Sequence, residues 1–229
     1  MNLLQFKNSP PLVRVVPFAI FLALTFCQNW FGETGQYWFY LAKTLAGAWF
    51  IWLVGPFVSE MRWRLSWEAI LVGALVFLIW VGLGNVLAWL GINPSFYELK
   101  LSTKTWNPMT TFGDGSVQAW FFVGVRILGA TLVVPPLEEV FFRSFLYRYI
   151  AKPDFKTVPL GLFILKSFLI TSVIFGFEHR EWLAGILCGF AYQGLVCWKK
   201  RLGDAITAHA LTNFLLGAFV VWKGAWHFW

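Results

Sequence analysis

Two adjacent glutamates, Glu138 and Glu139, are followed by Arg143 in an otherwise apolar stretch of the chain. A carboxylate near the middle of a bilayer costs on the order of 2.5–3.5 kcal/mol, so such residues usually serve a function. On a helix, Glu139 and Arg143 share a face and can pair, and a salt bridge near the membrane interface would explain that pair alone. Glu138 has no local partner, and like charges oppose each other's ionisation. The motif therefore indicates a functional site.

Two further motifs each place a histidine four positions from another residue. Phe175 precedes His179, and His209 precedes Asn213. At this spacing both members of a pair lie on one face of a helix. Taken singly, His179 could be an interfacial histidine, and His209 with Asn213 could simply hydrogen-bond helices together. Their chemistry becomes specific only in combination with the glutamates.

Together these residues supply the groups that hydrolysis needs. A carboxylate with a histidine can take a proton from water, and a histidine with an amide side chain can donate to a developing oxyanion. A low-dielectric cavity strengthens each contact. Two carboxylates and two histidines could in principle bind zinc, but neither His-Glu-x-x-His nor Cys-x-x-Cys occurs. We predict hydrolysis without a metal or another cofactor.

The surrounding elements must be membrane helices. The chain has 229 residues, of which 59% are hydrophobic and 13% charged, whereas soluble domains carry roughly 25% charged residues. A membrane span needs about 20 apolar residues. Such runs occur near 12–31, 37–58, 68–90, 117–136, 159–179, 182–198 and 204–222. We predict an all-α, polytopic transmembrane bundle, with residues 1–229 forming a single integral membrane domain. Residues 137–150 continue helically past Pro135 and Pro136, either as the second half of the fourth span or as a separate one, which makes seven or eight spans.

The net charge of +7 falls in short loops between apolar spans. This distribution favours topology determinants and anionic-lipid contacts over nucleic-acid binding. Lys and Arg gather at one set of span ends, and the positive-inside rule makes those ends and the N-terminus cytoplasmic. In this assignment His179 falls near the outer end of its helix, whereas Glu139 and His209 lie nearer the cytoplasm. A shared site requires similar depths, so this topology conflicts with the motifs.

The three motifs, in this order, carry a family resemblance. Glu-Glu-x-x-x-Arg at 138–143, Phe-x-x-x-His at 175–179 and His-x-x-x-Asn at 209–213 resemble the CPBP family of intramembrane proteases. That family includes the type II CAAX prenyl endopeptidases and the bacteriocin-processing or immunity (ABI) proteins. The resemblance covers about 120–222, and the Gly185–Gly189 region is similar to a small-residue helix of the family. Length and aromatic content are similar to those of a bacterial subgroup linked to exosortase-type protein sorting.

The resemblance implies an intramembrane endopeptidase of the glutamate type, without a metal, whose substrate is a hydrophobic or membrane-anchored peptide. By the resemblance, Glu139 with His179 activates the attacking water. Glu138 shares or tunes the charge, Arg143 holds the glutamates in place, and the His-x-x-x-Asn pair stabilises the tetrahedral oxyanion. Genuine CAAX cleavage requires a prenylated protein, which is not expected if the host is a bacterium. In a bacterium the chain would reside in the inner membrane.

Two other classes of function remain open. A non-catalytic scaffold or sorting partner would keep the motif without turnover, and its binding would survive loss of Glu139. A transporter could relay protons through Glu138 and Glu139, as intramembrane acids often do, and would not need Asn213. The sequence contains no internal repeat, which argues against the transporter.

Overall fold

The computed structural model describes residues 3–93, 96–99 and 105–229, and every regular element in these residues is a helix. The predicted all-α class is therefore confirmed. The helices are α1 (Leu3–Lys7), α2 (Leu12–Cys27), α3 (Gly32–Val54), α4 (Trp67–Trp89), α5 (Pro108–Phe112), α6 (Val117–Leu128), α7 (Val134–Glu139), α8 (Tyr147–Ala151), α9 (Leu165–Phe177), α10 (Trp182–Lys199) and α11 (Gly203–Lys223).

Length and hydropathy make this bundle an integral membrane protein. Four helical segments of the described chain are long and apolar enough to cross a bilayer, and two apolar helices are shorter. The four are Gly32–Phe57, Trp67–Trp89, Val117–Ala151 and Gly203–Lys223, and the shorter two are Leu12–Cys27 and Leu165–Phe177. Large apolar side chains point outward, as Trp52 (74% exposed) and Leu78 (58% exposed) illustrate. Lipid tails would cover them, which agrees with the predicted polytopic bundle.

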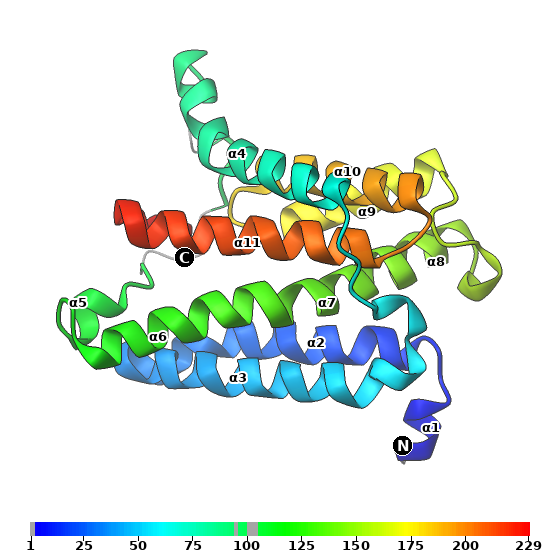
Figure 1. Ribbon diagram of the computed structural model, residues 1–229, viewed down its shortest axis with the longest axis horizontal. Helices are drawn as coiled ribbons and strands as arrows, with labels where there is room; N and C mark the ends of the chain where they lie inside the picture. The colour runs from blue at the N-terminus through cyan, green and yellow to red at the C-terminus, as the bar shows by residue number, and fades with distance from the viewer. Residues whose placement is uncertain (1–2, 94–95, 100–104) are drawn as a thin grey trace.

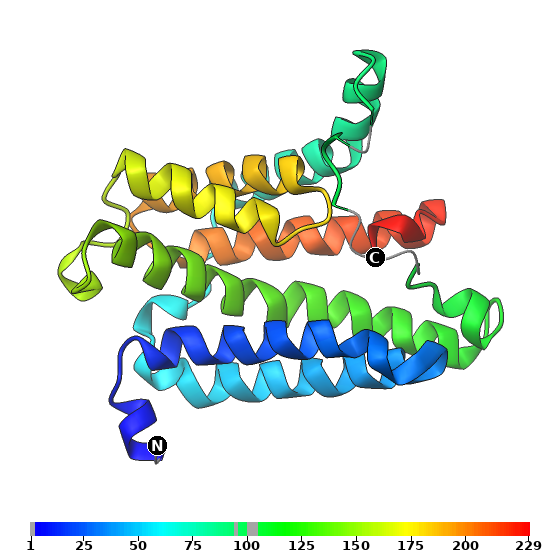
Figure 2. The same cartoon turned by 180° about the vertical axis from the view of Figure 1, so that it is seen from behind.

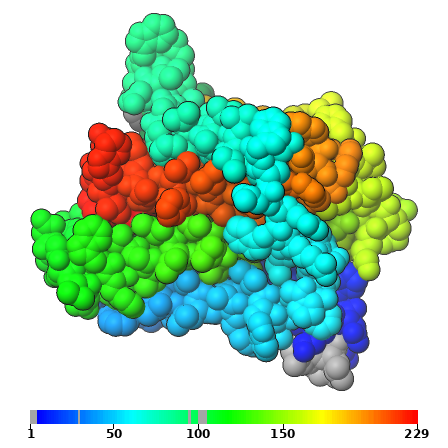
Figure 3. All heavy atoms as spheres, in the orientation of Figure 1, coloured from blue at the N-terminus to red at the C-terminus, as the bar shows by residue number. Residues whose placement is uncertain are grey.

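One long helix lies between two groups of helices. Figures 1 and 2 show α6, α7 and α8 joined end to end, with α2 and α3 on one side and α11, α4, α9 and α10 on the other. In the space-filling view, α3, α6, α11 and α4 lie one above another on the visible face (Figure 3). The central helix, which carries both glutamates, packs against α2 and α3 and against α11.

The central helix is continuous from Val117 to Ala151. A span that ends near residue 136 was therefore the wrong boundary, and residues 137–150 form its second half. The helix widens into π-helical turns at Gly129–Val133 and Val140–Leu146, on either side of α7. Proline lacks the N–H for the usual i→i−4 bond, and a wider turn accommodates Pro135 and Pro136 without ending the helix. Such π turns are frequent at functional sites.

Helix α9 begins at Leu165, later than the predicted residue 159. Its 13 residues extend only about 20 Å, less than the ~30 Å thickness of the hydrocarbon core. It packs on α10 through small residues. A Cβ added at Gly185 would lie 2.9 Å from the Gly176 Cα, and this close backbone approach fixes the residues that follow α9.

A buried polar cluster joins the N-terminal half to the central helix. Glu60, between α3 and α4, accepts hydrogen bonds from Arg14 Nη2 (2.6 Å) and from the Ser144 hydroxyl. Arg148 Nη2 lies 3.3 Å from the same Glu60 oxygen. Burial opposes ionisation of Glu60, but the Ser144 hydroxyl and the Arg14 guanidinium outweigh it and lower the pKa of the carboxyl. The cluster therefore holds an ionised Glu60 against two helices.

Candidate active site

The two adjacent glutamates face different surroundings. Successive residues on a helix point about 100° apart, so only one of the two can face a given cavity. Glu138 lines a cavity of about 450 Å³ between the helices, whereas Glu139 does not. Glu139 is fully buried (0% exposed) and Glu138 nearly so (7%). Glu138 is thus the carboxylate that a bound molecule would meet.

Glu139 contacts two side chains, His209 and Arg143. Its Oε1 accepts a hydrogen bond from His209 Nδ1 at 2.9 Å, and its Oε2 lies 3.3 Å from Arg143 Nε. The second contact confirms the predicted i,i+4 pair. Arg143 is 1% exposed, and its guanidinium lies 4.1 Å from the centre of the Phe175 ring. An ion pair this deeply buried is costly to break, so it fixes Glu139.

His209 is oriented from three directions. Its Nδ1 faces Glu139, and its Nε2 lies 3.9 Å from Glu138 Oε2. The imidazole stacks on the Tyr192 ring with centroids 5.0 Å apart. The Tyr192 hydroxyl donates to Thr212 Oγ1 at 2.8 Å, which fixes the tyrosine in turn. His209 therefore presents Nε2 to the cavity in one orientation.

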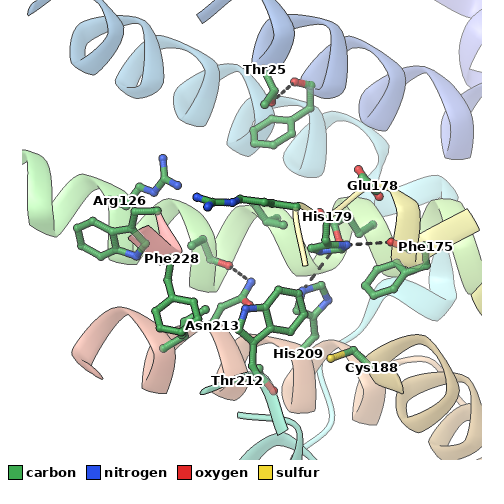
Figure 4. A pocket seen from close by; sticks show the side chains of 18 of the residues that line it. Thr25, Arg126, Phe175, Glu178, His179, Cys188, His209, Thr212, Asn213 and Phe228 are labelled. Carbon is green, nitrogen blue, oxygen red and sulfur yellow. Dashed lines mark hydrogen bonds and ion pairs between the residues drawn. The ribbon is translucent and has the colours of Figure 1, made fainter. Parts of the chain in front are cut away.

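His179 lies on the same cavity as Glu138 and His209. Its Nδ1 lies 2.8 Å from the carbonyl oxygen of Phe175. A carbonyl oxygen only accepts, so Nδ1 carries the proton and Nε2 is free to accept one from a bound molecule. Figure 4 shows His179 and His209 near each other beside the cavity. The expected separation of His179 from Glu138 and His209 is not found, because all three line one cavity and α9 has only 13 residues.

Asn213 completes the cavity lining among the predicted residues. Its Nδ2 donates to the carbonyl oxygen of Ala130 at 2.8 Å. That carbonyl lies in the first π turn, where the N–H of Val134 bonds to Gly129 instead. Pro135 has no N–H to offer. The amide of Asn213 is therefore anchored by one N–H and retains a second for another acceptor.

Sequence reasoning missed three charged residues of this cavity, Arg126, Glu178 and Arg180. Glu178 resembles a loop charge in the sequence, although its position directly before His179 was a usable signal. Glu178 Oε2 and Glu138 Oε2 are both buried without a hydrogen-bond partner among the described residues. Arg126 lies on the other side of the cavity from Glu178 (Figure 4). The stacking of Tyr192 on His209 had no sequence signal.

Within residues 3–93, 96–99 and 105–229, no group of three or more His, Cys, Asp or Glu side chains is arranged to hold a metal ion. The carboxylate of Glu139 is occupied by Arg143 and His209, which removes one potential ligand from the cavity.

Apolar helices enclose carboxylates, two histidines and an amide around one cavity, a combination of groups that could carry out acid–base chemistry. Residues 118–215 match the family described as type II CAAX prenyl endopeptidase Rce1-like. All three motifs fall within this match, so this segment of the chain is similar to that family of intramembrane proteases. The resemblance inferred from the motifs is thereby confirmed, while the exosortase-linked subgroup stays a prediction. No curated protein and no solved structure matches the chain.

Proposed function

We propose that the chain is an intramembrane endopeptidase in which Glu138 and His179 activate the attacking water. The observation that supports this most directly is the single cavity lined by Glu138, His179, His209 and Asn213. Glu139 lies behind it, paired with other side chains. The geometry thus favours an exchange of the roles expected of the two glutamates, with Glu138 as base and Glu139 as a positioning residue.

In the proposed first step, a water molecule hydrogen-bonds to the Glu138 carboxylate and to Nε2 of His179. An O–H bond breaks, its proton passes to Glu138, and the water oxygen bonds to the peptide carbonyl carbon. General base catalysis of this kind contributes about 10²- to 10⁴-fold. Protonated Glu138 then delivers the proton to the departing amine as the C–N bond breaks.

The developing oxyanion requires hydrogen-bond donors within reach of the carbonyl oxygen. The free N–H of Asn213 and Nε2 of His209, in its protonated form, are the proposed donors. Each such donor typically contributes about 10²- to 10³-fold to kcat. Glu139 would act indirectly, because its hydrogen bond to Nδ1 orients the His209 ring.

The proposed substrate is a hydrophobic or membrane-anchored peptide segment. Apolar and aromatic side chains form much of the cavity wall, among them Phe21, Leu22, Val134, Leu216 and Phe228. A polar, water-soluble peptide would gain little from contact with such apolar walls. We further propose that the N-terminus is cytoplasmic, because the Lys- and Arg-rich helix ends lie on that side by the positive-inside rule.

The test is peptide-bond cleavage by the purified, detergent-solubilised protein against a library of membrane-anchored peptides. Wild type, Glu138→Gln and His179→Ala would be compared, with and without a zinc chelator. Glu33→Gln, an exposed carboxylate, is the matched control and keeps wild-type cleavage. A metal-independent glutamate protease is supported if both active-site variants lose cleavage and the chelator leaves wild-type cleavage unchanged. Loss of cleavage with chelator refutes the metal-free mechanism.

The same preparation separates the rival functions. Well-folded wild type that binds library peptides without cleaving any of them would refute the protease and favour a scaffold. Proton flux into vesicles that needs Glu138 but tolerates Asn213→Ala would favour a transporter.

A further inference from the structure

The two ends of the helix bundle differ in charge. Figure 1 shows the N-terminus and α8 at one end, called here the α8 end, and the C-terminus and α5 at the other, called the α5 end. Among the described residues in loops or terminal helical turns, the α5 end carries the basic residues Arg180 and Lys223, and the sequence adds Lys100 and Lys104, which lie outside the described residues. The α8 end carries Lys7, Arg14, Arg62, Arg64, Arg148, Lys152, Lys156, Lys166, Lys199, Lys200 and Arg201. By the positive-inside rule the α8 end is cytoplasmic and the α5 end extracytoplasmic.

Packed side chains close the bundle at the α8 end. Leu202 and Ile206, at the start of α11, are fully buried (0% exposed) in the main hydrophobic core. Ser66 donates a hydrogen bond to Asp204 at 2.5 Å, which ties α11 to the start of α4. None of these residues lines the cavity, so the described structure offers no path to it from this end.

The cavity reaches the surface at the α5 end. Tyr192 and His209, on its wall, are 1% and 4% exposed. Arg180 lines the same cavity, and half of its side-chain surface (50%) is exposed. Thr25, in the last turn of α2, also lines the cavity and is exposed. The buried groups of the candidate active site are therefore connected to the surface through residues at the α5 end.

The short helix α9 leaves room for this opening. Both α9 and α11 begin at the α8 end and run toward the α5 end (Figures 1 and 2). With 13 residues against 21, α9 extends roughly 12 Å less far. Arg180 follows α9 and pairs with Glu98 at 3.1 Å. An exposed ion pair is stable in water or among lipid headgroups but not among lipid tails, so the end of α9 borders an aqueous recess.

A second cavity adjoins the first beside this ion pair. Its volume is about 260 Å³, and its wall includes Asn85, Glu98 and Glu181. Trp80 and Phe228 line both cavities, so the two are neighbours. Carboxylates and an amide on a cavity wall are solvated by water rather than by lipid. The two cavities together form a polar route from the α5 end to the candidate active site.

We propose that the substrate enters this cavity from the extracytoplasmic side and is therefore a membrane-anchored segment of an exported protein. The inference rests on the proposed endopeptidase function and on the proposed cytoplasmic N-terminus, and it adds the compartment from which the substrate comes. Extended backbone is tolerated at membrane depth only where protein or a water-filled cavity surrounds it. The recess beside Arg180 provides that surrounding for the segment that approaches Glu138 and His179, while the apolar anchor stays in lipid.

Two reporter proteins with one scissile segment, taken from the best-cleaved library peptide, test the side of entry. Each has a single membrane anchor and one lysine beside the segment, which is extracytoplasmic in the first reporter and cytoplasmic in the second. Expressed with the wild-type chain in bacterial cells, the first reporter should be cleaved roughly 10²-fold faster, because the lysine of the second would have to cross the bilayer. In detergent, where sidedness is lost, both should be cleaved equally.

Glu138→Gln should abolish cleavage of both reporters, and the matched control Glu33→Gln should keep the wild-type rates. Equal rates in cells, or faster cleavage of the cytoplasmic reporter, would overturn the inference.

Thiol labelling determines the side of entry without any cleavage. Single cysteines are placed at Leu216 on the cavity wall, at Glu33 near the α5 end and at Lys152 near the α8 end, in a chain whose three native cysteines are replaced by alanine. A membrane-impermeant methanethiosulfonate, added to intact spheroplasts, should modify Leu216→Cys and Glu33→Cys, and should modify Lys152→Cys only after lysis. Gel filtration in detergent verifies that each variant is folded, and the reporter experiment retains the native cysteines.

Three labelling results would overturn the inference: modification of Leu216→Cys only after lysis, no modification of it at all, or modification of Lys152→Cys in intact spheroplasts. The expected labelling pattern, combined with no cleavage of any library peptide by wild type in detergent, would refute the endopeptidase while the side of entry stands.

Discussion

The adjacent glutamates should respond oppositely when each is replaced by its isosteric amide. Glu139→Gln removes the anion 3.3 Å from Arg143 and leaves a guanidinium that is 1% exposed without a charged partner. Glu138→Gln removes a carboxylate whose Oε2 is buried without a hydrogen bond among the described residues. We expect the first variant to lose stability and the second to keep it or gain slightly.

The magnitude follows from burial. Removing one partner of a buried ion pair costs about 3–5 kcal/mol, because the remaining charge is uncompensated. For a chain of this size, 1 kcal/mol shifts the unfolding temperature by roughly 2–4 °C. Glu139→Gln should therefore unfold roughly 6–20 °C below wild type. The Glu138→Gln value should equal or exceed that of wild type, although this variant loses cleavage activity.

Unfolding in one detergent, followed by tryptophan fluorescence, provides the comparison. The double variant Glu139→Gln, Arg143→Met replaces the ion pair by an amide and an apolar side chain, so most of the lost stability should return. A Glu139→Gln protein that unfolds within about 2 °C of wild type would refute the assigned burial of the pair. Equal losses for both single variants would show that Glu138 is as firmly paired as Glu139.

Three further outcomes follow from other contacts. Asn213→Ala should lower kcat by about 10²- to 10³-fold with little change in KM; equal kcat in both proteins would exclude an oxyanion role. Gly185→Ala places a Cβ 2.9 Å from backbone atoms of Gly176 and should cost about 1–3 kcal/mol in unfolding free energy, whereas Gly194→Ala, in the same helix with nothing within 4 Å, should be neutral or slightly stabilising. The lowered pKa of Glu60 contributes stability that is complete above the unfolded value of about 4.3 and is lost as the pH falls through the folded pKa. The free energy of unfolding, measured from pH 7 to 3.5, should therefore decline less steeply for Glu60→Gln than for wild type. Parallel curves for the two proteins would contradict the buried cluster around Glu60.

Local sequence patterns were enough to predict the elements and the grouping of the site. Apolar runs predict membrane helices because every backbone polar group must be satisfied inside lipid. The i,i+4 spacing predicts that Glu139 meets Arg143, and the structure contains that pair. The three motifs lie far apart in sequence, yet residues of all three line one cavity. We expected this grouping because the proposed chemistry needs these side chains close together.

Two features could not be predicted from sequence: the position of His179 at the cavity, and which of the two glutamates faces the cavity. The start of α9 depends on a turn at Gly161, which adopts φ +79° and packs so closely that a Cβ would lie 2.6 Å from the Val196 carbonyl oxygen. Which glutamate faces the cavity depends on the rotation of the central helix. Each π turn inserts an extra residue and shifts that rotation, and no sequence period records the shift.

The proline pair connects the fold to the proposed chemistry. Pro135 would ordinarily be expected to break a helix, yet it lies within a helix that continues to Ala151. The π turn before it directs the Val134 N–H to Gly129, and Pro135 cannot donate, so the Ala130 carbonyl is left without a backbone donor. Asn213 supplies that donor from α11. The same local irregularity that interrupts regular hydrogen bonding thus positions the amide beside the cavity that Glu138 lines.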